Sequence, residues 1–165
     1  MTEMLYGETA SAPRTFHRFR AQVLEIAVRL EYGMDECISA AYGQNASTAQ
    51  ELRGEILGAV SVRQRISILR RIMEDRELSD SYPFVVPVLQ KLFDLRNVMA
   101  HSIGDGYDDA ARSISLTSVR RGREERKTFT LVYLHWLQEQ AEQVVRELGE
   151  LFWLIAPDNE QWHEG

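Results

Sequence analysis

Three polar residues near position 100 have the types and the spacing that acid–base chemistry on a phosphate group requires: Arg96, Asn97 and His101. A histidine side chain titrates near neutral pH and can accept or deliver a proton. An arginine can hold two phosphate oxygens with its planar fork, and the amide of Asn97 can orient the phosphate or the imidazole. Such a set could cleave RNA without a metal ion, because that reaction needs proton transfer and positive charge on the phosphorane.

These residues end an apolar stretch with helical spacing, which predicts a helix over about 84–102. The expected buried stripe of this helix consists of Val85, Leu89, Leu92, Met99 and Ile103. Because a helix turns by about 100° per residue, Arg96 falls inside that stripe, while Asn97 and His101 share a neighbouring face. A buried cation needs an anion. Glu31, on the apolar side of the first helix, is the predicted supporting partner of the arginine, within the bundle or across a dimer interface.

The string LRNVMAH, residues 95–101, resembles the signature of the HEPN superfamily: an arginine, a polar residue and a histidine four to six positions after the arginine. In that family the motif lies late in a bundle helix, as it does here. Many HEPN members are metal-independent endoribonucleases, often toxins or phage-defence effectors, and they typically act as dimers that bring two motifs into one cleft. The resemblance implies catalytic roles for Arg96, His101 and Asn97, and a homodimer whose two histidines supply an acid and a base.

The same string fits other functions. Some HEPN members have no demonstrated catalysis and serve as binding modules, and the string is also similar to that of mannitol-operon repressors, which are all-helical regulators. In such a non-catalytic regulatory or protein-interaction module, Arg96 would lock its helix to the first helix. A third hypothesis is an antitoxin or chaperone-like partner of a toxin. Ile103 stands where some toxin members carry a tyrosine that a partner nucleotidyltransferase modifies, so that form of neutralisation is not expected.

Apolar residues at helical spacing predict three further amphipathic helices. The first covers about 15–43. The second follows the N-cap candidates Ser47 and Thr48 and restarts after a kink at Ser61. The last covers about 131–155.

Between the third and the last helix the apolar period changes from about 3.6 to about 2 residues. Residues 104–109, GDGYDD, are expected to form a loop, and about 112–132 a β-hairpin. The predicted fold is mainly α: an up-down four-helix bundle with a β-hairpin inserted before the last helix. Residues 15–156 are expected to form one HEPN-like domain, with a flexible leader over 1–14 and a flexible tail over 157–165.

The net charge of −6 argues against a protein that coats nucleic acid without selectivity, but it allows a local basic surface. Such a surface is predicted at the hairpin tip around Gly122, whose sequence RRGREERK carries five cations and two anions. Arg120, Arg121 and Arg123 are the expected RNA contacts there. The alternative is a tip that is simply solvated.

Cys37 is the one cysteine of the chain, which argues against a disulfide framework and a cysteine-rich metal site. Neither a metal nor another cofactor is expected. The sequence has no apolar run of the about 18 to 20 residues that a membrane span needs, and its N-terminus lacks the pattern of a signal peptide. A cytoplasmic protein is expected. Its predicted partners are RNA, including tRNA, a second copy of the chain, and an antitoxin or regulatory protein.

Overall fold

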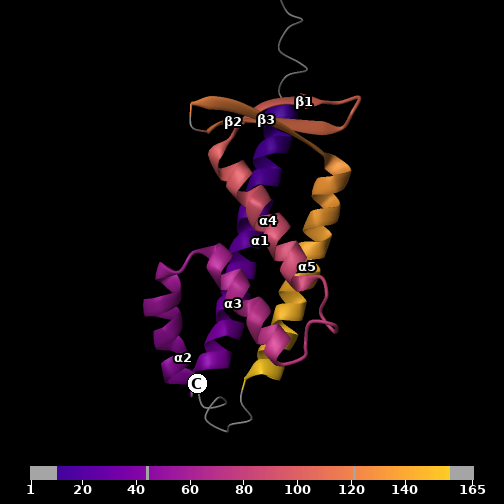
Figure 1. The fold of residues 1–165 in the computed structure, drawn as a ribbon. Helices are drawn as coiled ribbons and strands as arrows, with labels where there is room; N and C mark the ends of the chain where they lie inside the picture. The colour runs from indigo at the N-terminus through magenta and orange to yellow at the C-terminus, as the bar shows by residue number, and fades with distance from the viewer. Residues whose placement is uncertain (1–10, 44, 121, 157–165) are drawn as a thin grey trace, which may run out of the picture.

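The computed structural model describes residues 11–43, 45–120 and 122–156, and helices account for most of them (Figure 1). A small antiparallel sheet covers one end of the helices. The helical elements, in chain order, are α1 (Ser11–Tyr42), α2 (Ala46–Glu51), the π-helical turn η1 (Leu52–Ile56), the 3-10 turn η2 (Leu57–Ala59), α3 (Val62–Asp75), α4 (Val85–His101) and α5 (Leu131–Ile155). Within the described ranges, no helix is both long and apolar enough to cross a bilayer.

The N-terminal helix is longer than predicted. It begins at Ser11, so the last residues of the expected leader are helical. Pro13 lies in its first turn, where the missing backbone N–H would have no helical partner anyway. The rest of the predicted leader, residues 1–10, and the predicted tail, residues 157–165, lie outside the described residues.

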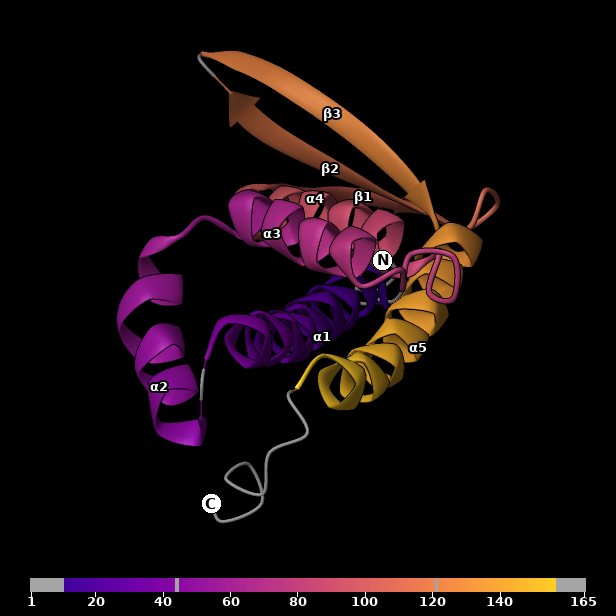
Figure 2. The same ribbon diagram turned by 60° about the horizontal axis from the view of Figure 1, so that its bottom comes forward.

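The helices α1, α3, α4 and α5 pack around a shared apolar core (Figure 2). α1 and α5 run in the same direction: the Phe19 ring packs against His135 near the start of both helices, and Gly33 lies beside Leu148 further along. In an up-down bundle the first and fourth helices are antiparallel, so the predicted up-down order is wrong. The chain makes one more reversal than predicted, because α2, η1 and η2 return beside α1 before α3 begins.

The restart of the second helical region at Ser61 is confirmed. Ser61 Oγ accepts a hydrogen bond from the backbone N–H of Gln64 at 3.4 Å, and Gln64 Oε1 accepts one from the backbone N–H of Ser61 at 3.1 Å. This reciprocal capping box starts α3. The N-cap of α2 is Asn45 and not Ser47 or Thr48, because Asn45 Oδ1 accepts a hydrogen bond from the backbone N–H of Thr48 at 3.0 Å.

The sheet has three antiparallel strands in chain order, namely β1 (Ile103–Asp108), β2 (Ser113–Arg120) and β3 (Arg123–Thr130). β2 and β3 form an antiparallel hairpin, but it belongs to a three-stranded sheet and is not the isolated hairpin of the prediction. The turn between them contains Gly122 with a φ of 75°, a conformation that favours glycine. The predicted loop over 104–109 is wrong, because most of these residues belong to β1.

β1 forms although glycine and aspartate are poor strand residues. It lies at the edge of the sheet, and its pairing with β2 shifts register between Gly104 and Gly106. Edge strands commonly accommodate such a bulge. Gly104 also passes close to Phe16 of α1, where a Cβ atom would lie 2.9 Å from a ring carbon. Contacts between distant parts of the sequence therefore position this strand.

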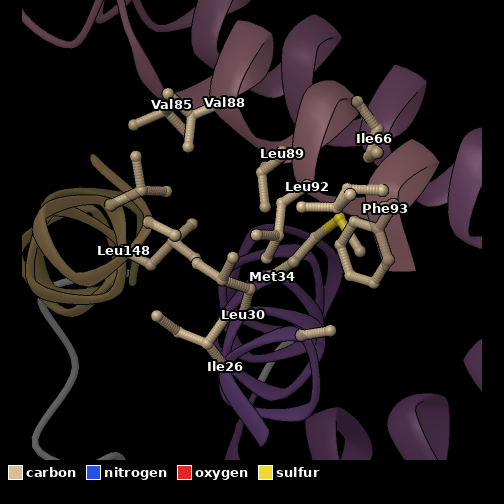
Figure 3. Packing of buried hydrophobic residues seen from close by; sticks show 14 of the residues in the cluster. Ile26, Leu30, Met34, Ile66, Val85, Val88, Leu89, Leu92, Phe93 and Leu148 are labelled. Atoms are coloured by element: carbon tan, nitrogen blue, oxygen red, sulfur yellow. The ribbon is translucent and has the colours of Figure 1, made fainter. Parts of the chain in front are cut away.

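The buried core fixes α4 against α1 and α5. Figure 3 shows Leu30 and Met34 of α1 in one cluster with Leu89 and Leu92 of α4 and Leu148 of α5. Each of these five side chains is at most 1% exposed. Because burial of one such side chain contributes about 1.5–3 kcal/mol, the cluster strongly opposes rotation or sliding of α4. The polar face of α4 is thereby held in a fixed orientation.

Candidate functional site

Arg96, Asn97 and His101 lie in the last two turns of α4. The helix ends at His101 because Ser102 takes an extended backbone conformation, with φ of −114° and ψ of 154°, and leads into β1. The side chains of Asn97 and His101 are exposed and lie on one face of the helix. The same helix is thus anchored in the core on one side and presents polar groups on the other.

Arg96 is not buried in the apolar stripe, contrary to the prediction. Its side chain is partly exposed, and its Nη1 donates a hydrogen bond to Oδ1 of Asn97 at 3.2 Å. Four residues of the predicted stripe, Val85, Leu89, Leu92 and Met99, are buried as expected, and Leu95 joins them at 4% exposure. Ile103 is 79% exposed because the helix ends before it. The guanidinium of Arg96 therefore lies at the edge of the polar face, next to Asn97.

The predicted pair between Glu31 and Arg96 is wrong within the chain. Glu31 pairs with Arg65 of α3, whose Nη1 also donates a hydrogen bond to Oδ2 of Asp35 at 2.6 Å. Arg65 is 6% exposed. Burial raises the pKa of the Asp35 carboxyl above its ordinary value, although the hydrogen bond and charge of Arg65 act to lower it. Among the arginines whose side chains the structure describes, the buried one is therefore Arg65, which links α3 to α1.

A polar groove of about 640 Å³ lies between α4 and the β2–β3 hairpin, and we call it the α4–hairpin groove. It is lined by Asp94, Asn97, Val98, His101 and Ser102 from α4 and the residue after it, and by Ser118, Val119, Glu125 and Lys127 from the hairpin. Its volume lies in the range of about 300–1,000 Å³ that is usual for ligand pockets. The groove combines an imidazole, an amide, an ammonium group and two carboxylates.

The register of the hairpin explains how Lys127 and Glu125 reach this groove. Leu116 is paired with Lys127, and Ser118 is paired with Glu125. Side chains of directly paired residues lie on the same face of a sheet. Because Leu116 is buried in the core below the sheet, Lys127 also faces the helices, and Glu125 follows two residues away on the same face. Lys127 is thus the cation that the sheet brings to the groove.

Of the three predicted RNA contacts at the hairpin tip, the structure describes the side chain of Arg123 alone. Arg123 begins β3, is exposed and is not among the groove residues. Arg121 and the side chain of Arg120 lie outside the described residues. Lys127, which lines the groove, was not among the predicted contacts.

The arrangement is suited to acid–base chemistry on a phosphodiester. His101 is exposed to the groove and can carry a proton, and Asn97 connects the groove to the guanidinium of Arg96. Among the residues that the structure describes, no three histidine, cysteine, aspartate or glutamate side chains form a group that could hold a metal ion. His101 can transfer a proton, and the guanidinium of Arg96 can stabilise negative charge beside it.

No family model, curated protein or solved structure matches the chain. The basis for a functional proposal is therefore the polar end of α4 and the α4–hairpin groove.

Proposed function

We propose that the chain is a metal-independent endoribonuclease of the HEPN type that acts in the cytoplasm as a toxin or phage-defence effector. One observation carries the proposal: His101 and Asn97 line a polar groove of about 640 Å³, and Asn97 holds the guanidinium of Arg96 beside it. In this proposal α1, α3, α4 and α5 are the HEPN-like bundle, and the hairpin is the insertion before its last helix. Glu31 has no part in the chemistry, because it pairs with Arg65.

The proposed reaction is an internal transesterification of RNA. The 2′-hydroxyl loses its proton and its oxygen attacks the adjacent phosphorus. The bond to the 5′-oxygen breaks, and that oxygen takes up a proton. The products are a 2′,3′-cyclic phosphate and a free 5′-hydroxyl, so neither water nor a cofactor is consumed. His101 performs one proton transfer, and His101 of a second copy of the chain performs the other.

Arg96 stabilises the phosphorane in this scheme. Its planar fork can donate to two non-bridging oxygens while Asn97 keeps the guanidinium oriented through the 3.2 Å hydrogen bond. Lys127 adds a second positive charge at the groove. The arginines of the hairpin tip, Arg120, Arg121 and Arg123, are proposed to attract longer RNA substrates such as tRNA, because phosphate attraction acts before docking.

The test uses purified protein with tRNA and total RNA in excess EDTA. Wild type is expected to produce fragments that end in 2′,3′-cyclic phosphate. Arg96→Lys should keep the wild-type melting temperature but lose most of the cleavage, since a lysine cannot reproduce a bidentate fork. Arg70→Lys is the matched control, because Arg70 is exposed on α3 and does not line the groove. A folded wild-type dimer that cuts neither RNA would contradict the proposal.

A second candidate is a non-catalytic regulatory or protein-interaction module, similar to the mannitol-operon repressors. It is favoured by an apolar groove of about 540 Å³ between α1 and α5. Val28, Tyr32 and Trp153 line this groove and are 66%, 61% and 63% exposed, and exposed apolar patches often bind other proteins. An antitoxin, a regulator or a second copy of the chain would bind there.

Growth of bacteria that express the protein separates the two functions. A toxin of the proposed kind arrests growth, and His101→Ala relieves the arrest. An interaction module is indifferent to His101→Ala but responds to Tyr32→Asp, which places a charge in the apolar groove.

A further inference from the structure

Three aromatic side chains contact one another in series where β3 joins α5. The Phe129 and Tyr133 rings are stacked at 6.2 Å between centroids with an interplanar angle of 19°, and the Tyr133 and Trp136 rings lie 6.0 Å apart. Tyr133 is 36% exposed and Trp136 is 41% exposed. We call these three residues the aromatic strip. Phe129 is partly buried against the core, so the exposed aromatic area of the strip comes from Tyr133 and Trp136.

The local structure explains this alignment. Thr130 caps α5 by accepting a hydrogen bond from the backbone N–H of Tyr133 at 3.2 Å, so the strand passes into the helix without a loop. Positions 133 and 136 are then neighbours on one face of the helix. The buried face of this first part of α5 is supplied by other residues, Leu131, Leu134 and Leu137. Tyr133 and Trp136 therefore lie outside the stripe that fills the core.

The aromatic strip reaches the α4–hairpin groove at its β3 end and contacts a lysine of α4 at its α5 end. Lys127 of the groove lies two residues before Phe129 on the same face of β3, about 7 Å along the strand. At the other end, Nζ of Lys91 lies 5.3 Å from the centroid of the Trp136 ring. Lys91 is one helical turn from Asp94, which lines the groove. One lysine thus lines the groove two residues from Phe129, and the other lies over the Trp136 ring.

We infer that the aromatic strip is a stacking platform for the bases of single-stranded RNA whose backbone passes through the α4–hairpin groove. The inference rests on the proposed ribonuclease function and adds the form of RNA that the site accepts. Every base has a flat face that can stack on tyrosine or tryptophan, whereas the bases of a duplex are stacked on each other and cannot reach the strip. Lys91 and Lys127 attract the phosphates that flank the stacked bases.

The acidic residues of the groove set the strength of this binding. Asp94 and Glu125 line the groove together with Lys127 and repel phosphate. Stacking on Tyr133 and Trp136 must then supply much of the affinity, and binding should be selective for unpaired RNA without strong selectivity for base identity. A surface used for protein contacts would have no such preference for unpaired RNA over duplex RNA.

The test measures RNA binding in proteins that all carry His101→Ala, so that no RNA is cut. The probe is a fluorescein-labelled single-stranded RNA of roughly 12 nucleotides and mixed sequence, compared with the same RNA annealed to its complement. Trp136→Leu and Tyr133→Leu, which keep an apolar side chain, should each raise Kd about ten-fold or more. Tyr42→Leu, at the end of α1 and 61% exposed in the parent, should leave Kd unchanged. The duplex should bind more weakly than the single strand.

Three results would overturn the inference: no RNA binding by the His101→Ala protein, equal effects of Tyr133→Leu and Tyr42→Leu, or unchanged Kd in a Trp136→Leu protein with the parent's melting temperature. The ribonuclease proposal fails separately. If the protein that retains His101 binds single-stranded RNA through Trp136 but does not cut it, the stacking platform stands and the nuclease proposal fails. If it cuts RNA and Trp136→Leu changes neither KM nor Kd, the nuclease stands and the platform does not.

Discussion

Replacing Arg65 with methionine should lower the free energy of unfolding more than replacing an exposed arginine does. Arg65 is 6% exposed and pairs with both Glu31 and Asp35. Removing one partner of a buried ion pair costs about 3–5 kcal/mol, because the remaining charge stays buried without compensation. The Glu31 side chain is 35% exposed and partly screened by water, which favours the lower end, about 3 kcal/mol. In a chain of this size that loss lowers Tm by about 6–12 °C.

The assay is urea unfolding followed by circular dichroism of the helices, with Arg96→Met as the matched control. Arg96 is partly exposed and hydrogen-bonds Asn97 in its own helix, so its loss should cost less than about 1 kcal/mol. The double variant Arg65→Met/Asp35→Asn should lose less unfolding free energy than the two single variants lose in sum, because the two groups interact. Equal losses of stability for Arg65→Met and Arg96→Met would refute this account of the buried arginine.

The pH dependence of the same variant follows from the carboxyl group. Burial raises the pKa of Asp35 above 3.8, and Arg65 lowers it. Without Arg65 the native pKa rises further, so the native state binds its proton more firmly than the unfolded chain does. The stabilisation that this carboxyl group contributes is present below pH 3.8 and is lost as the pH rises through its native pKa. The difference in unfolding free energy between wild type and Arg65→Met should therefore be smaller near pH 3.8 than at neutral pH.

Three further predictions test the buried Cys37 and the close approach of Gly104 to Phe16. Burial raises the pKa of the Cys37 thiol from 9.0 to about 12, so a thiol reagent at neutral pH should label Cys37 in the urea-unfolded protein and leave the native protein unlabelled; rapid native labelling would contradict this. Native Cys37 also retains a proton that the unfolded chain loses, and its contribution to stability should decline as pH rises from 9.0 to about 12, which unfolding at alkaline pH measures. Gly104→Ala should lower Tm because the new Cβ would lie 2.9 Å from the Phe16 ring, whereas Gly106→Ala has open space around it and should not; thermal melts of both variants decide the point.

The helices could be predicted from sequence where one apolar stripe dominates. The last helix was expected over about 131–155 and is Leu131–Ile155, and the hairpin at Gly122 follows from alternation on either side of a glycine. β1 could not be predicted in this way. Its strand conformation depends on pairing with β2 and on the passage of Gly104 past Phe16, and neither contact leaves a local pattern.

The same distinction applies to the site. The spacing of Asn97 and His101 placed both on one face of a helix, and the structure places them in one groove. The predicted partner of Glu31 is wrong within the chain, because a helical wheel does not say which cation of another helix approaches. Asp35, one turn after Glu31, was the available signal, since two acidic groups on one face indicate a shared cation such as Arg65.

Lys127 was missed for a different reason. Charge density favours the hairpin tip as a phosphate contact, whereas Lys127 reaches the groove through the register of the strands. Antiparallel pairing on the two sides of the turn at Gly122 pairs Lys127 with the apolar Leu116, which assigns Lys127 to the face toward the helices.

The measurement that tests the central claim most directly is the rate of RNA cleavage in excess EDTA by wild type, His101→Ala and His17→Ala. His17 is an exposed histidine on α1 that does not line the α4–hairpin groove, so it controls for the loss of an imidazole. Wild type and His17→Ala should cut RNA at similar rates, and His101→Ala should be slower by about 10²–10⁴-fold, the usual contribution of a general acid or base. Cleavage by His101→Ala at the wild-type rate would contradict the claim that this groove is the active site.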